Sequence, residues 1–152
     1  MAMYPPPPEA PVSTYEGGAS GPRAGFGRRL VGAIIDGVIL YIVSLILQSS
    51  LSRGAAFGIG TLVGLLYATL LVGSSRGQTI GQMMMGIRVI DFNTGGPIGY
   101  GRAFIRWLVS ILSAVAILIG YLWMLWDKEK QCWHDKAAND VVVPVQYYPV
   151  QR

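Results

Sequence analysis

Three long apolar stretches, each close to the length needed to cross a bilayer, dominate the pattern of hydrophobic and polar positions along the chain. They cover about residues 30–47, 55–73 and 107–126, and a membrane-spanning helix needs about 17–25 predominantly apolar residues. Only residues 48–54 separate the first two stretches, so we expect these two to form an antiparallel hairpin. The pattern predicts an all-α membrane protein with three transmembrane helices.

The segment between the second and third stretches, residues 74–106, is too polar and too rich in glycine to be a fourth span. Residues 78–85 are typical of a short interfacial helix, residues 87–91 of a strand, and residues 93–96 of a turn. We therefore expect a small cytoplasmic β-hairpin with an interfacial helix between spans two and three. Residues 141–145 have strand-like composition as well.

The two ends of the chain differ in composition from the part between them. Residues 1–25 hold a run of four prolines and several glycines, a composition that buries too little apolar surface to fold. We expect a disordered cytoplasmic arm over 1–25, a transmembrane domain over 26–146 and a short tail over 147–152. The arm and the long first apolar stretch do not resemble a cleaved secretory signal, so we expect the first span to stay in the protein.

Arginines beside the apolar stretches predict the orientation. Arg23, Arg28 and Arg29 precede the first span, and Arg76, Arg88, Arg102 and Arg106 lie between the second and third. Cytoplasmic loops carry such an excess of Lys and Arg, so we expect a cytoplasmic N-terminus in a bacterial plasma membrane. Three spans would then place the C-terminus outside, although three lysines after the third span suit the cytoplasm.

Overall composition supports a membrane protein and excludes some other classes. Of the 152 residues, 52% are apolar and 13% are charged, whereas soluble domains carry about 25% charged residues. The net charge of +4 comes with no basic domain and no nucleic-acid-reading motif, so the lipid bilayer is the expected partner and nucleic acid is not. Cys132 is the only cysteine, which rules out an intrachain disulfide.

Asp36 lies seven residues inside the first apolar stretch and is the most informative polar position. A charged side chain at membrane depth costs about 2.5–3.5 kcal/mol on insertion scales, so it needs polar partners. Tyr67, Ser110 and Ser113 lie at a comparable depth on the other spans and are candidate hydrogen-bond donors, and Arg102 and Arg106 are candidates to balance the charge. Asp36 then either fastens the helices together or handles an ion.

Other chemistry is poorly supported by the sequence. His134 and Asp135 are adjacent and the chain has no second histidine, a poor arrangement for a metal site. No nucleophile elbow and no phosphate-binding loop with its lysine occurs. We expect no catalytic residues, no metal and no cofactor, and therefore no enzyme.

Several separated motifs together resemble the RDD family of small membrane proteins. They are GFGRRLVGAIID at 25–36, GQTIGQMMMGIRVID at 77–91 and HDKAANDVVV at 134–143, and the resemblance runs from about residue 25 to 145. The family is named for one arginine and two aspartates, which the resemblance assigns to Arg29, Asp36 and Asp135, with His134 beside the last. Arg28 competes for the first role, but the spacing to Asp36 favours Arg29.

The resemblance implies an integral membrane protein whose molecular role is largely undefined, with some members linked to sodium/proton exchange or other transport. Two hypotheses follow for this chain. In the first, a polar cluster around Asp36 supports transport of an ion or small solute, with a homo-oligomer completing the path. In the second, the chain is a non-catalytic accessory or assembly subunit that binds a partner membrane protein.

Overall fold

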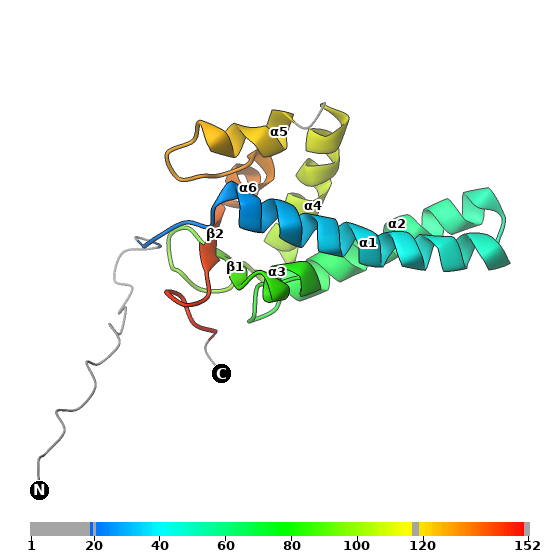
Figure 1. Ribbon diagram of the computed structural model, residues 1–152, viewed down its shortest axis with the longest axis horizontal. Coiled ribbons are helices and arrows are strands. Elements are labelled where there is room, and N and C mark those ends of the chain that lie inside the picture. Colours follow the sequence, from blue (N-terminus) through cyan, green and yellow to red (C-terminus); the bar gives the residue numbers. More distant parts are fainter. Residues whose placement is uncertain (1–18, 20, 117–118, 151–152) are drawn as a thin grey trace, which may run out of the picture.

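The computed structural model describes residues 19, 21–116 and 119–150, which are mostly helical (Figure 1). Most of the predicted arm therefore lies outside the described residues. The elements in chain order are α1 (Phe26–Ser50), α2 (Arg53–Gly73), α3 (Ile80–Met84), β1 (Ile87–Asp91), α4 (Gly99–Val115), α5 (Ile119–Leu122), the 3-10 helix η1 (Trp123–Leu125), α6 (Trp133–Ala138) and β2 (Asp140–Pro144).

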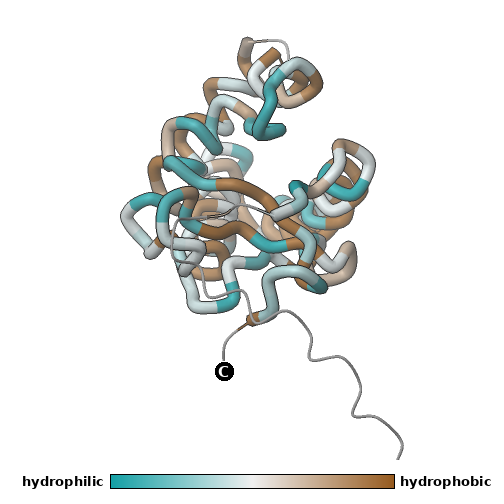
Figure 2. The backbone as a smooth tube through the Cα atoms, turned by 90° about the vertical axis from the view of Figure 1, so that its left-hand side faces the viewer, coloured by the Kyte–Doolittle hydropathy of each residue, from teal (hydrophilic) through white to brown (hydrophobic). Residues whose placement is uncertain are grey.

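Helices α1 and α2 form the predicted hairpin, and both are long and apolar enough to cross a membrane. They contain the first two predicted spans and extend them by a few residues. The hairpin exposes large apolar side chains, with Phe57 at 78% and Ile46 at 62% exposed. Figure 2 shows hydrophobic residues, in brown, in both the coiled and the extended parts of the backbone. Such surface is suited to lipid.

The third apolar stretch is not one straight helix. Helix α4 and the segment Ile119–Leu125 are bent by 112° relative to each other and reach the length of a span only when taken together. The fold brings Gly120 so close to Ser113 that a Cβ atom on the glycine would overlap the serine hydroxyl. In Figure 1, α5 turns back toward the beginning of α1. The predicted single span over 107–126 is therefore broken.

Strand β1 forms where it was predicted, but its partner is different. It pairs antiparallel with β2, so that Val89 lies opposite Val142 and Ile90 opposite Val141. The predicted hairpin within residues 74–106 is therefore wrong. The turn after β1 does form, since the Asp91 carboxylate accepts hydrogen bonds from the next backbone amides, but the chain then enters α4 instead of a second strand. The valine-rich C-terminal strand takes that place.

Both faces of the two-stranded sheet are covered. Val72 at the end of α2 and Ala103 of α4 belong to the cluster on one face, and Tyr148 belongs to the cluster on the other. The backbone amide of Ala24 donates to the carbonyl of Val142 at 2.8 Å, and that of Ala19 donates to Phe92 at 3.0 Å. Residues before 26 and after 146 thus belong to the folded part, which extends beyond the predicted bounds at both ends.

We predict that the two ends of the folded part lie on the same side of the membrane. Arg23 donates to Glu129 at 2.9 Å, across the gap between the start of α1 and the segment after η1. In a Cys132→Ser background, Pro22→Cys and Lys128→Cys are expected to react equally with a membrane-impermeant maleimide in intact cells. Ser50→Cys, at the far end of the hairpin, is expected to react oppositely. A Lys128→Cys variant that reacts like Ser50→Cys would contradict this topology.

Candidate functional site

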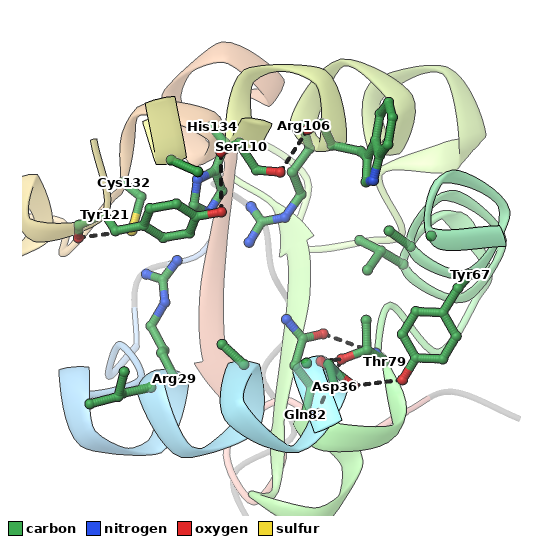
Figure 3. A pocket seen from close by; sticks show the side chains of 18 of the residues that line it. Arg29, Asp36, Tyr67, Thr79, Gln82, Arg106, Ser110, Tyr121, Cys132 and His134 are labelled. Carbon is green, nitrogen blue, oxygen red and sulfur yellow. Dashed lines mark hydrogen bonds between the residues drawn. The ribbon is translucent and has the colours of Figure 1, made fainter. Parts of the chain in front are cut away.

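The carboxylate of Asp36 accepts three hydrogen bonds from two other parts of the chain. Its Oδ1 accepts from the Tyr67 hydroxyl at 2.6 Å and from the Gly81 amide at 2.8 Å, and its Oδ2 accepts from the Thr79 hydroxyl at 2.6 Å. Figure 3 shows the side chains of Tyr67 and Thr79 converging on Asp36 at one side of a cavity. Among the residues that the structure describes, no Lys, Arg or His forms an ion pair with Asp36.

Helix α3 reaches Asp36 because of its own N-terminal cap and two glycines. The Thr79 hydroxyl accepts from the Gln82 amide at 3.3 Å, and the Gln82 side chain accepts from the Thr79 amide at 3.0 Å, which together form a capping box. Gly81 then contacts the α1 backbone at Gly32, where a Cβ atom on Gly81 would overlap the carbonyl oxygen. The interfacial helix is thereby held on the face of α1 that carries Asp36.

Substituting Gly81 by Ala is expected to separate α3 from α1. The added methyl group has no space against the Gly32 carbonyl and the Asp36 carboxylate, and overpacking of this kind costs about 1–3 kcal/mol. The expected result is a lower midpoint of thermal unfolding for the detergent-purified protein. Gly58→Ala is the matched control, because a Cβ at that helical glycine meets nothing within 4 Å. Equal midpoints for the two variants would show that the close contact does not matter.

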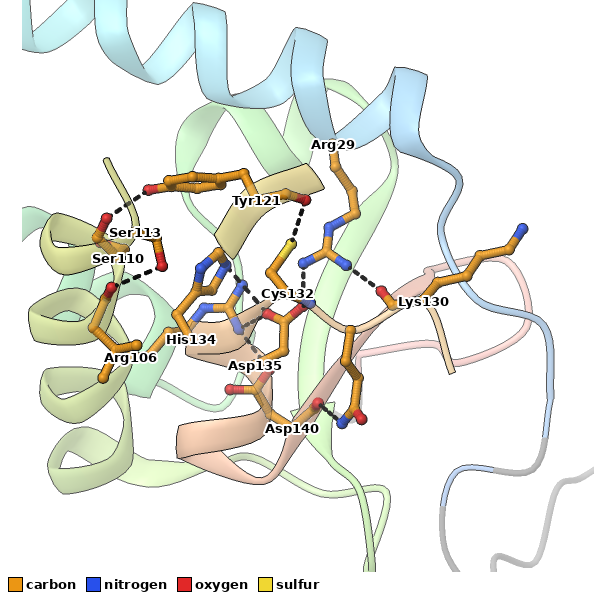
Figure 4. A network of polar contacts seen from close by, with 12 residues as sticks. Arg29, Arg106, Ser110, Ser113, Tyr121, Lys130, Cys132, His134, Asp135 and Asp140 are labelled. Carbon is orange, nitrogen blue, oxygen red and sulfur yellow. Dashed lines mark hydrogen bonds and ion pairs between the residues drawn. The ribbon is translucent and has the colours of Figure 1, made fainter. Parts of the chain in front are cut away.

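A second polar cluster surrounds Asp135, at the N-terminus of α6 (Figure 4). Its Oδ2 pairs with Arg29 of α1 and accepts from the Cys132 backbone amide at 2.8 Å, while its Oδ1 pairs with Arg106 of α4. The His134 Nε2 atom lies 3.3 Å from the same Oδ1. The side chain of Asp135 is completely buried, so one carboxylate connects α1, α4 and α6.

Asp140 shares Arg106 with Asp135. The Oδ1 atom of Asp140 lies 2.5 Å from the Arg106 Nη1 atom, whereas its buried Oδ2 has no hydrogen-bond partner within the described part of the chain. Asn139 ends α6 in the left-handed conformation, with φ of 51°, and this turn places the first residue of β2 beside Asp135. Two carboxylates therefore face one guanidinium.

The environment separates the pKa values of the two carboxyl groups. Burial alone would raise the pKa of Asp135, but the guanidiniums of Arg106 and Arg29 hold it well below its usual range. Burial raises the pKa of Asp140 to about 8, with Arg106 opposing and the charge of Asp135 adding to the shift. At neutral pH the cluster thus holds one firmly ionised carboxylate and one largely protonated carboxyl group.

Two further titratable groups in the cluster are neutral. Burial lowers the pKa of His134 to about 3, and burial raises the pKa of the Cys132 thiol to about 11. Ligand atoms of Cys132, His134 and Asp135 lie within 4.8 Å of one another. A metal cation does not fit among them, since both oxygens of Asp135 already face guanidinium groups that would repel it.

One cavity of about 560 Å³ connects the two clusters, within the range typical of small-molecule sites. Asp36, Tyr67 and Thr79 line one end, and Arg29 and Arg106 line the other. Figure 3 shows Arg29 and Asp36 on α1 and Arg106 on the facing helix α4. The lining between these ends is mainly apolar and includes Leu30, Ala33, Leu40, Val72, Trp107 and Met124.

The two serines predicted as partners of Asp36 do not reach it. The Ser110 hydroxyl donates to the Trp107 carbonyl at 2.6 Å, and the Ser113 hydroxyl donates to the Val109 carbonyl at 3.0 Å, both within α4. Both serines lie on the part of α4 that contacts α5, where the Ser110 carbonyl accepts from the Tyr121 hydroxyl at 3.3 Å and Ser113 lies against Gly120. Tyr67, by contrast, is brought to Asp36, because the short connection between α1 and α2 fixes the relative depth of those helices.

The two arginines predicted to balance the charge of Asp36 are engaged elsewhere. Arg102 pairs with Asp91 and donates to the carbonyls of Ala138 at 2.6 Å and Asn139 at 2.5 Å, at the C-terminal end of α6. Arg106 pairs with the carboxyl groups near α6. The structure thus separates a cluster at Asp135, which contains arginines, from one at Asp36, which has no ion pair among the described residues.

Sequence reasoning missed three of the residues that build these clusters. The contact of Thr79 and Gly81 with Asp36 depends on the packing of α3 on α1. The Thr-x-x-Gln spacing is the one signal that could have located the start of this helix. For Asp140, no sequence pattern indicates that it shares Arg106, since this contact arises from the turn at Asn139 and the pairing of β2 with β1.

Comparison with known proteins gives a family match over most of the chain. A family model described as the RDD family matches residues 23–139. A proline-rich antigen of Mycobacterium leprae is 38% identical over 71 residues, which cover 47% of this chain and 28% of that protein. A proline-rich antigen homolog of Mycobacterium tuberculosis is 35% identical over 69 residues, 45% of this chain and 29% of that protein.

A longer alignment is found with the uncharacterized protein YxaI of Bacillus subtilis, which is 26% identical over 147 residues. It covers 79% of this chain and 96% of that protein. The chain spans less than a third of the length of the two mycobacterial relatives. No solved structure matches.

Proposed function

This chain belongs to the RDD family, and we propose that it supports the passage of a cation across the membrane by binding it at Asp36 inside the cavity. The observation that carries this proposal is a carboxylate on an apolar helix with three hydrogen-bond donors and, among the described residues, no cationic partner. Intramembrane ionisable side chains with this placement often mark ion pathways. The match to the RDD family model confirms the resemblance seen in the sequence. The transport role is our proposal.

The local chemistry of Asp36 suits a cation. Its Oδ2 accepts one hydrogen bond and its Oδ1 accepts two, so Oδ2 retains a free lone pair. The hydroxyl oxygens of Tyr67 and Thr79 lie 2.6 Å from the carboxylate and provide further oxygen ligands, which hard cations prefer. A bound cation would also remove the cost of an uncompensated charge at membrane depth.

We also propose the setting in which this site acts. The chain lies in a bacterial plasma membrane with its N-terminus in the cytoplasm, consistent with the arginines that precede α1 and those between α2 and α4. Within the described residues, two helices and one bent helix pair are few for a complete path. A homo-oligomer would supply the remaining walls.

Reconstituted flux measurements test the cation site. Protein in liposomes is expected to give cation-dependent proton flux, and Asp36→Asn is expected to abolish it while the protein remains folded. Asp127→Asn is the matched control, because that aspartate pairs with Lys136 and does not line the cavity. Flux that is unchanged in Asp36→Asn would overturn the proposal. Absence of flux together with a stoichiometric co-purifying membrane protein would favour the accessory-subunit hypothesis.

A further inference from the structure

The cavity offers a ligand a second charged end besides Asp36. We infer that it binds a dipolar molecule whose cationic amino group lies at Asp36, whose anionic group lies at Arg106, and whose middle is a short apolar chain. This inference rests on the proposed cation site and names the class of solute that the site accepts. The two charged ends belong to opposite walls of one cavity (Figure 3).

Arg106 has donor groups left for such an anion. Its Nη1 atom makes the contacts with Asp135 and Asp140. Within the described part of the chain, its Nη2 and Nε atoms have no hydrogen-bond acceptor, although the residue is buried and lines the cavity. A guanidinium carries five N–H donors in a planar fork. A carboxylate or phosphate in the cavity would use the donors that Asp135 and Asp140 leave free.

The charges around Arg106 favour an anion at that end. Arg29 lines the same part of the cavity and shares Asp135 with Arg106, so two guanidiniums face one carboxylate that both contact. Of these two arginines, Arg106 is the one that pairs with the second carboxyl group, Asp140. An acid group entering from the cavity would place its charge between Arg29 and Arg106, opposite to Asp36.

The spacing and the walls define the middle of the ligand. Arg29 and Asp36 are seven residues apart on α1, a rise of about 10 Å. Apolar side chains, among them Leu30, Leu40 and Trp107, line the cavity between its charged ends. A chain of methylene groups fits this surface, whereas a compact ion reaches only one end. The expected compounds are therefore ω-amino acids of medium chain length or molecules of the same chemistry.

Calorimetric titration of the purified protein with three compounds tests the inference. The compounds are ω-amino-octanoate, which carries both charges, octylamine, which lacks the acid, and octanoate, which lacks the amine. Hydrogen bonds to a charged group contribute enough free energy for about a tenfold change in affinity. We expect ω-amino-octanoate to bind at least about tenfold more tightly than octylamine, and octanoate to bind most weakly. The shorter compound ω-aminobutanoate is expected to bind no more tightly than an amine of equal length.

Two variants test the contributions of the two charged ends of the cavity separately. Arg106→Lys keeps a cation for Asp135 but removes the free guanidinium donors, and it is expected to reduce binding of ω-amino-octanoate to the level of octylamine without changing octylamine binding. Asp36→Asn is expected to abolish binding of both amines. Equal affinities for ω-amino-octanoate and octylamine in the unsubstituted protein would overturn this inference and leave the cation site intact. If octanoate binds, and if the affinities for both amines are the same in Asp36→Asn as in the unsubstituted protein, the cation site is overturned as well.

Discussion

Substitution of Asp135 by Asn is expected to remove most of the folded protein. The side chain is completely buried and pairs with both Arg29 and Arg106, so the loss of its charge removes the carboxylate partner of Arg29 and leaves Arg106 with Asp140 alone. Breaking a buried ion pair in this way costs about 3–5 kcal/mol, and a domain of this size has about 5–15 kcal/mol in total. The asparagine amide would also direct a donor toward groups that are themselves donors. Size-exclusion chromatography of the detergent extract measures the loss.

Asp140→Asn is the matched control for that experiment. Asp140 is equally buried and contacts the same guanidinium, but burial raises its pKa to about 8, so it is largely neutral at pH 7. The asparagine carbonyl can accept from Arg106 as Oδ1 does. We expect this variant to accumulate close to the level of the unsubstituted protein. If both variants fail equally, the two carboxyl groups do not have the distinct roles assigned to them.

The pKa shifts of Asp140 and His134 predict a dependence of stability on pH. Because the folded pKa of Asp140 is raised to about 8 from 3.8, its contribution to stability is complete at low pH and is lost as the pH rises through that interval. His134 acts oppositely, since its folded pKa of about 3 means that stability falls as the pH drops below 6.5. Between about pH 6.5 and 8, Asp140 alone of these two groups contributes. Asp140→Asn should therefore flatten the decline of the unfolding midpoint in that interval.

The sequence predicted the hairpin α1–α2 well because the length of an apolar run translates directly into a membrane-spanning helix. The same rule failed for the third stretch, since length does not indicate a bend. The bend brings Gly120 into close contact with Ser113, and hydropathy contains no information on that contact. The sheet shows a similar limit. Composition identified both strands, but the pairing of β1 with a strand almost fifty residues later depends on the whole fold.

The candidate site was predictable to the extent that one helix hairpin determines it. Counting residues inward from the cytoplasmic ends of the first two spans places Tyr67 at the depth of Asp36, and the structure has that hydrogen bond. The same count failed for Ser110, whose hydroxyl donates to the Trp107 carbonyl within α4. Asp135 was assigned from the family resemblance, but its contact with Arg29 requires the chain to return to the start of α1. That return follows from the bend after α4.

Replacement of Asp36 by Leu is expected to prevent accumulation of folded protein. The leucine would leave the Tyr67 hydroxyl, the Thr79 hydroxyl and the Gly81 amide without their acceptor, and each buried unsatisfied group costs about 1–3 kcal/mol. Removing a charge from membrane depth returns about 2.5–3.5 kcal/mol. The cost of the unsatisfied donors is expected to exceed this gain, because the backbone amide of Gly81 cannot rotate to another acceptor. The close contact of α3 with α1 also leaves little space for a larger side chain.

Asp36→Asn separates this structural role from cation binding. Its amide oxygen can accept from Tyr67 and Gly81 as Oδ1 does, while its amide nitrogen can donate to the Thr79 hydroxyl oxygen. The Asn variant should therefore accumulate in membranes and elute as the unsubstituted protein does, and the Leu variant should not. Normal accumulation of the Leu variant would show that the three donors do not need this carboxylate. Since the Asn side chain keeps the hydrogen bonds and loses only the charge, any flux that disappears in it depends on that charge and not on the packing of α3.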